Sequence, residues 1–218
     1  MRRLWGRANS VNVQKVLWAL DELGLPYERV DAGGAHGVVN DAAYRAMNPN
    51  GLVPTLQEGD FVLWESNAIL RYLAAAYGGA AAHGGAAAHG GPLALPGDAH
   101  ARARIDQWLD WQATSFTPAM RDAFIQTYRV AAAQRDHAAV TASLARTEGH
   151  AETLDRHLAG QPFVAGDRFS IADIAVGCAA HRWLHMPHAI GERPALSRWY
   201  AGIAARPGAA QVIAEPIS

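Results

Sequence analysis

The turn at Val53-Pro54 is the first of two motifs whose residue types suit the binding of a small peptide. It closes a loop and opens a strand-like run over residues 55–57, a place where an X-Pro bond can be held cis in a tight turn. The proline removes one backbone donor. The fixed turn leaves the N–H and C=O of Val53 to pair with an extended ligand, as an added strand would.

Glu65-Ser66 is the second motif, and it follows a predicted hairpin that turns at residues 59–60. The apolar residues after it have helical spacing: Ile69, Leu70, Leu73 and Tyr77. Ser66 therefore lies in the first turn of a helix, where backbone N–H groups and a hydroxyl make a carboxylate site. Glu65 beside it can take up an ammonium group. A site that binds both groups suits the α-amino acid end of a ligand.

A third set of chemically useful residues lies near the N-terminus. A short strand over residues 4–6 and a loop over residues 7–9 lead into a helix that ends at Gly24. Its apolar stripe is formed by Val13, Val16, Leu17, Leu20 and Leu23. Ser10 and Asn12 lie at its start, where the positive end of the helix dipole and a hydroxyl donor favour a thiolate over a thiol. Ser10 also fits a plain helix cap, and the sequence does not separate the two roles.

The order and spacing of the Val53-Pro54 turn and the Glu65-Ser66 helix start resemble the glutathione S-transferase superfamily, in its serine-type, theta/delta-like bacterial branch. The resemblance extends along nearly the whole chain. It implies an α+β fold, with a thioredoxin-like N-terminal domain followed by an all-α C-terminal domain. It also implies that Val53 and Pro54 hold the cysteinyl backbone of glutathione and that Glu65 and Ser66 hold its γ-glutamyl end.

The same resemblance gives the thiol-activating role to Ser10, with Asn12 as the alternative donor. A tyrosine-type enzyme is disfavoured because the first tyrosine is Tyr27, well past the strand. The only cysteine, Cys178, lies in an apolar helical stretch, so a cysteine-type enzyme is disfavoured more strongly. The loop over residues 32–40 holds no obvious basic residue for the glycyl carboxylate, and His36 is assigned that contact.

The second half of the chain has helical patterns throughout. Trp111, Thr114 and Phe116 come off the end of its first helix, where the resembled family has its second-substrate pocket. An apolar wall with a few polar groups suits hydrophobic electrophiles. Trp111 fits plain interdomain core equally well. Ser170 and Asp173 have the spacing of a capping box and are assigned a role in folding only.

Three segments are predicted from these patterns. Residues 1–78 form the thioredoxin-like, glutathione-binding domain and residues 99–218 the helical domain. Residues 79–98 form a linker, because Gly-Gly-Ala-Ala-Ala-His occurs twice in tandem from Gly78 and such a composition buries little. The histidines of a glycine-rich loop make a poor metal site, so no metal is expected.

Composition excludes several classes of protein. The net charge of −1 gives no field to attract nucleic acid or an anionic membrane surface, and no apolar run is long enough to span a bilayer. A single cysteine permits no intramolecular disulfide, which fits a reducing, cytoplasmic location. We therefore expect a cytoplasmic glutathione S-transferase acting on a hydrophobic electrophile, and the resemblance implies a homodimer. The alternatives are a glutathione-dependent isomerase or dehalogenase, and a non-catalytic glutathione-binding scaffold.

Overall fold

The computed structural model describes residues 1–79 and 91–218, and the chain folds into two compact units. The first unit contains Met1–Pro96 and Arg206–Glu215, and the second contains Gly97–Ala205 and Pro216–Ser218. Most of the predicted linker repeat falls on residues 80–90, outside the described residues.

A mixed sheet of four strands forms the centre of the first unit. Its strands are β1 (Arg2–Trp5), β2 (Glu28–Val30), β3 (Thr55–Glu58) and β4 (Phe61–Trp64), in the order β2-β1-β3-β4. β1 runs parallel to β2 and antiparallel to β3, and β3 and β4 form the predicted hairpin around Gly59. Trp5 pairs with Thr55, so the end of β1 lies beside the residue that follows the Val53-Pro54 turn.

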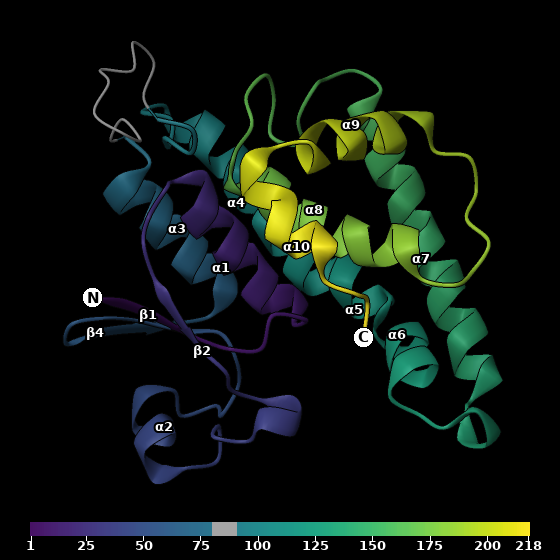
Figure 1. Cartoon of the computed structure of the whole chain (residues 1–218). Coiled ribbons are helices and arrows are strands. Elements are labelled where there is room, and N and C mark those ends of the chain that lie inside the picture. Colours follow the sequence, from purple (N-terminus) through teal and green to yellow (C-terminus); the bar gives the residue numbers. More distant parts are fainter. Residues whose placement is uncertain (80–90) are drawn as a thin grey trace. The chain divides into compact units, whose positions relative to one another are not determined.

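Helices cover both faces of this sheet (Figure 1). α1 (Val11–Glu22) and α3 (Ser66–Tyr77) pack against each other on one face, and α2 (Ala42–Met47) lies on the other. The predicted stripe of α1 is buried, and Gly24 has the positive φ that ends the helix. The predicted thioredoxin-like fold of the N-terminal domain is confirmed.

The second unit is helical, as predicted. Its helices are α4 (Ala99–Trp111), α5 (Thr117–Ala119), α6 (Arg121–Tyr128), α7 (His137–Leu158), α8 (Ile171–His185) and α9 (Pro194–Ala204). α8 is the core helix, since nearly all of its residues are buried. The predicted capping box at its start is confirmed: Ala172 N–H donates to Ser170 Oγ, and Ser170 N–H donates to Asp173 Oδ2.

The segment Arg206–Glu215, which contains α10 (Ala210–Ala214), belongs to the first unit. The sequence analysis had placed it in the helical domain. Arg206 pairs with Glu22 of α1, and Gln211 Nε2 donates to Tyr27 Oη at 2.7 Å. These contacts join residues far apart in the sequence, which no local pattern reveals.

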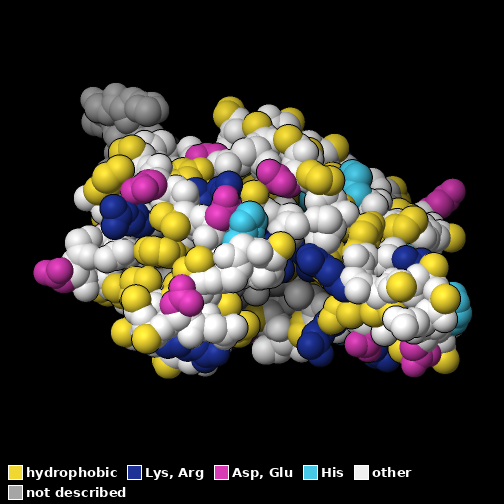
Figure 2. All heavy atoms as spheres, turned by 60° about the horizontal axis from the view of Figure 1, so that its bottom comes forward, with side chains coloured by type: hydrophobic (Ala, Val, Ile, Leu, Met, Phe, Trp, Pro, Cys, Tyr) yellow, Lys and Arg dark blue, Asp and Glu magenta, His cyan; other side chains and the backbone are white. Residues whose placement is uncertain are grey.

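Charged side chains of both signs are mixed on the face of the molecule that Figure 2 shows, in line with the small net charge. Within residues 1–79 and 91–218, no helix is long and apolar enough to cross a bilayer. The same residues contain no group of three or more His, Cys, Asp or Glu side chains placed to hold a metal ion.

Candidate active site

The Val53-Pro54 turn is cis and is held by buried side chains beneath it. Tyr44 Oη donates to the carbonyl of Leu52 at 2.7 Å, and Asn48 Nδ2 donates to the same carbonyl at 2.9 Å. Burial raises the pKa of Tyr44, so its hydroxyl stays a neutral donor. The described residues provide no backbone hydrogen-bond partner for Val53. The turn is thus fixed from inside while Val53 remains available to an added strand.

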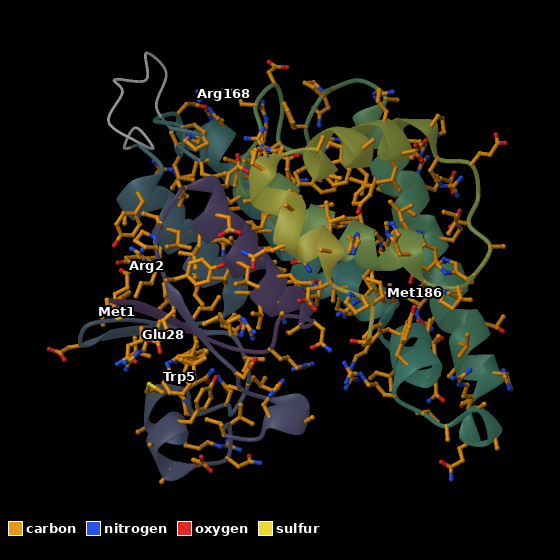
Figure 3. The ribbon with its side chains drawn as sticks, viewed as in Figure 1. Met1, Arg2, Trp5, Glu28, Arg168 and Met186 are labelled. Atoms are coloured by element: carbon orange, nitrogen blue, oxygen red, sulfur yellow. The ribbon has the colours of Figure 1, made fainter. Side chains whose placement is uncertain are left out.

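Trp5 completes the support of this turn. Its ring meets that of Tyr44 edge to face at 6.0 Å between centroids, and Figure 3 shows Trp5 at the end of β1, on the side of α2. Thr55 Oγ1 accepts a hydrogen bond from Asn48 Nδ2 at 3.1 Å and lies 2.9 Å from Tyr44 Oη. Trp5, Tyr44, Asn48 and Thr55 were not singled out in the sequence analysis. The Asn-Pro-Asn-Gly run at residue 48 signalled a turn, but only the fold turns Asn48 inward.

The start of α3 lacks the usual capping groups. Its N-cap residue is Glu65, whose side chain makes no capping hydrogen bond, and the first turn contains no acidic residue. Glu65 has a φ of +69°, a left-handed conformation rare for residues with a Cβ and typical of ligand clamps. Ser66 is buried directly behind it. The first turn of this helix therefore contains no carboxylate, and the carboxylate of Glu65 does not cap it.

The start of α1, like that of α3, has no side-chain cap. Ser10 is the N-cap residue and is 8% exposed, but its side chain makes no capping hydrogen bond, and no acidic residue lies in the first turn. Asn12 is half-buried in the same turn. Gly6 fixes the approach to this start, because a Cβ there would lie 2.4 Å from a methyl group of Val13. A hydroxyl at the positive end of a helix is thus left available for a ligand.

A glycine-rich loop runs beside these elements. A Cβ on Gly33 would lie 3.3 Å from Val53 Cγ1, and one on Gly34 would lie 3.2 Å from Arg7 Cδ, so the loop packs closely on both side chains. His36, the predicted contact for the glycyl carboxylate, is exposed with Nε2 3.9 Å from Asp31 Oδ1. Arg7 brings to this loop the basic group that the loop's own sequence lacks.

The predicted second-substrate residues lie in the second unit, around a π-helical turn over Gln112–Phe116 that continues α4. Trp111 stacks on the buried Phe116 at 5.1 Å and meets His150 edge to face at 5.7 Å. Thr114 is exposed, and its hydroxyl donates to the carbonyl of Asp110 at 2.8 Å. π-Helical turns are rare and recur at functional sites. Trp111 and Phe116 thus form one aromatic cluster, and Thr114 lies apart from it with a hydroxyl already bonded.

Both the sequence and the fold are similar to those of known proteins. Residues 4–81 match the glutathione S-transferase N-terminal domain, and residues 137–202 match the glutathione S-transferase C-terminal domain. The chain is 40% identical over 220 residues to glutathione S-transferase GstB of Escherichia coli, with 100% of both chains covered. It is 33% identical to glutathione S-transferase 3 of Zea mays, over 97% of this chain and 93% of that protein.

Among solved structures, the chain is similar to the theta class glutathione S-transferase of Xanthomonas axonopodis pv. citri with glutathione bound. The TM-score is 0.90 at 40% identity, over 100% of this chain and 99% of that one.

Proposed function

The chain belongs to the glutathione S-transferase family, and we propose that it ionises the thiol of bound glutathione beside Ser10 and transfers the thiolate to a hydrophobic electrophile. It is a transferase, and glutathione is its co-substrate. The observation that carries the proposed mechanism is the start of α1, where a nearly buried Ser10 hydroxyl makes no capping hydrogen bond.

In the proposed complex, glutathione lies along the first unit as an added strand. Val53 pairs with its cysteinyl backbone across the turn closed by Pro54, and Glu65 and Ser66 bind the ammonium and carboxylate of its γ-glutamyl end. His36 contacts the glycyl carboxylate. The lack of a backbone partner for Val53 among the described residues, and of an acidic residue in the first turn of α3, supports this arrangement.

Activation of the thiol follows from the position of Ser10. A thiolate there accepts a hydrogen bond from the hydroxyl and meets the positive end of α1, and both effects lower the pKa of the bound thiol. Asn12, two residues further on in the first turn of α1, is the alternative donor. The thiolate then forms a C–S bond with the electrophilic carbon, whose leaving group departs with the electron pair. The enzyme contributes thiolate stabilisation and proximity, without a covalent intermediate of its own.

The electrophile is proposed to be apolar, with Trp111 and Phe116 as aromatic walls and Thr114 as a polar neighbour. The partly exposed ring of Trp111, held by stacking on the buried Phe116, supports this assignment, because aromatic faces bind flat apolar molecules. Truncation of Trp111 to alanine should raise KM for an aromatic electrophile while the affinity for glutathione stays unchanged.

A homodimer and a cytoplasmic location complete the proposal. Leu52 and Phe61 are 64% and 44% exposed, and a second subunit would remove such large apolar side chains from water. Sedimentation equilibrium tests this, with Leu52→Asp expected to weaken the dimer. The one cysteine of the sequence, Cys178, is buried and reduced, which suits a reducing compartment.

The experiment that tests the mechanism combines calorimetric titration with glutathione and thiolate absorbance of the complex against pH. For Ser10→Ala we expect retained binding, a raised thiol pKa and a kcat/KM lower by roughly tenfold to a hundredfold, because a hydrogen bond to a charged group contributes about 1.5–3 kcal/mol. Asn12→Ala is the matched variant. An unchanged thiol pKa in Ser10→Ala with a raised one in Asn12→Ala would transfer the role to Asn12.

A further inference from the structure

A lysine lies inside the first unit, directly behind the start of α3. Lys15 is the only lysine of the sequence, and all other cationic side chains are arginines. It is 1% exposed on α1, on the side that packs against α3. Its Nζ lies 3.2 Å from Ser66 Oγ and 3.1 Å from Asn67 Oδ1. An ammonium group is thus enclosed beside the first two residues of α3.

Two sources of positive polarity meet at this point. One is the ammonium group of Lys15, which burial removes from water. The N-terminal end of α3 also has positive polarity, so the helix dipole and the ammonium repel each other. The first turn of α3 contains no acidic residue, and Glu65, its N-cap residue, makes no capping hydrogen bond. The two positive groups favour a ligand carboxylate there, beside the Glu65 carboxylate that is assigned to the ammonium of the same ligand.

The hydrogen bonds also fix the direction in which Ser66 donates. An ammonium group has donors only, so in its contact with Lys15 the Ser66 oxygen accepts and its proton remains for another acceptor. Asn67 must likewise present its carbonyl oxygen to Lys15. A hydroxyl that accepts from a cation is polarised and becomes a stronger donor. A carboxylate, which only accepts, is the complement of a serine held in this way.

We propose that Lys15 is a positioning residue for the carboxylate subsite at the start of α3. It holds the Ser66 hydroxyl as a donor and adds positive charge behind it, so that the subsite selects the α-carboxylate of a γ-glutamyl ligand. The inference rests on the proposed binding of glutathione at Glu65 and Ser66, and it adds the selection for a carboxylate over an uncharged group of the same shape.

The test compares two ligands on two proteins. The ligands are glutathione and its analogue with a carboxamide in place of the γ-glutamyl α-carboxylate, and the proteins are the wild type and Lys15→Met, which keeps the side-chain length. We expect Lys15→Met to bind glutathione on the order of tenfold more weakly and to bind the analogue as the wild type does. Equal weakening of both ligands would assign Lys15 to packing of α1 on α3 and overturn the proposal, as would no weakening of either.

A second measurement needs no variant. Because the chain has one lysine, protein labelled with [¹³Cε]lysine gives a single lysine resonance. Saturating glutathione should shift this resonance, and the carboxamide analogue should shift it much less. Equal shifts with both ligands, or none, would contradict the proposal even if Lys15→Met does not fold.

The two proposals fail in different ways. Absence of glutathione binding to the wild type would overturn the proposed function together with the inference. Glutathione binding that persists in Lys15→Met with its preference over the analogue intact would overturn the inference alone.

Discussion

The starts of α3 and α8 contain similar residues, but the charged side chains beside their serines have opposite signs. Both carry a buried serine near the N-terminus of a helix. At α8, Ser170 and Asp173 bind the first backbone N–H groups, and Asp173 also accepts from Val164 N–H and Trp199 Nε1, each at 2.9 Å. The helix therefore has an anion supplied by the protein itself.

At α3, the side chains leave the helix start open. Glu65 makes no capping hydrogen bond, no acidic residue lies in the first turn, and Lys15 donates to Ser66 from behind. The comparison teaches that a serine at a helix start takes its role from the charge beside it. At α8, the carboxylate of Asp173 binds the helix start and stabilises the fold. At α3, the ammonium group of Lys15 lies behind Ser66, and the helix start can bind the carboxylate of a ligand.

Removal of the carboxylate at α8 should have the largest effect on stability. Asp173→Ala leaves buried donors of Val164, Ser170 and Trp199 without an acceptor, and each such donor costs about 1–3 kcal/mol. We expect the free energy of unfolding at pH 7 to fall by roughly 3–5 kcal/mol in urea titrations. Asp167→Ala, in the exposed loop before the helix, is the control and should change it little. Asp173→Ala protein that remains folded should bind glutathione with the affinity of the wild type. A loss of affinity would contradict the view that the start of α8 serves folding alone.

The effect of Asp173 should also depend on pH. Burial raises its pKa to about 6, against hydrogen bonds from Val164, Trp199 and Ser170 that lower it. The folded state therefore keeps a proton on Asp173 between about pH 4 and 6, where the unfolded chain has lost it, and stability from this group falls as pH rises through that window. The gap between wild type and Asp173→Ala should widen by up to about 3 kcal/mol from pH 6 to pH 4. A gap that narrows would mean that the donors and the helix dipole outweigh burial.

These two helix starts also mark how far the sequence could predict the molecule. The capping box and the α1 stripe are local patterns whose residues recur at spacings of three and four, so the sequence identifies them and the fold confirms them. Lys15 meets Ser66 only through the packing of α1 on α3, and no spacing connects them. The same holds for Arg7, which reaches the glycine loop from another segment. A lone lysine within an apolar helix was the available signal.

Matched serine variants should separate the two roles. Ser66→Ala removes a donor to the ligand carboxylate, so we expect glutathione affinity to fall by about 1.5 kcal/mol, or about tenfold. Ser170→Ala removes a helix cap and should lower the free energy of unfolding by about 1 kcal/mol with unchanged affinity. Calorimetry and urea unfolding on both variants measure both quantities. If both variants change only the affinity, or both change only the free energy of unfolding, the two serines do not have separate roles.

The smallest effect concerns the backbone of Glu65. Its φ of +69° is strained for any residue with a Cβ and relaxed for glycine. Glu65→Gly and Glu65→Ala both remove the proposed ammonium contact, so both should weaken glutathione binding equally. Only the glycine variant relieves the strain, and we expect it to unfold with a free energy about 1 kcal/mol higher than the alanine variant. Equal stabilities would show that Glu65 holds no strain in the ligand-free protein. If Glu65→Gly raises the free energy of unfolding and lowers the affinity for glutathione, the wild-type conformation of Glu65 serves ligand binding and lowers stability. The start of α8, in contrast, stabilises the fold.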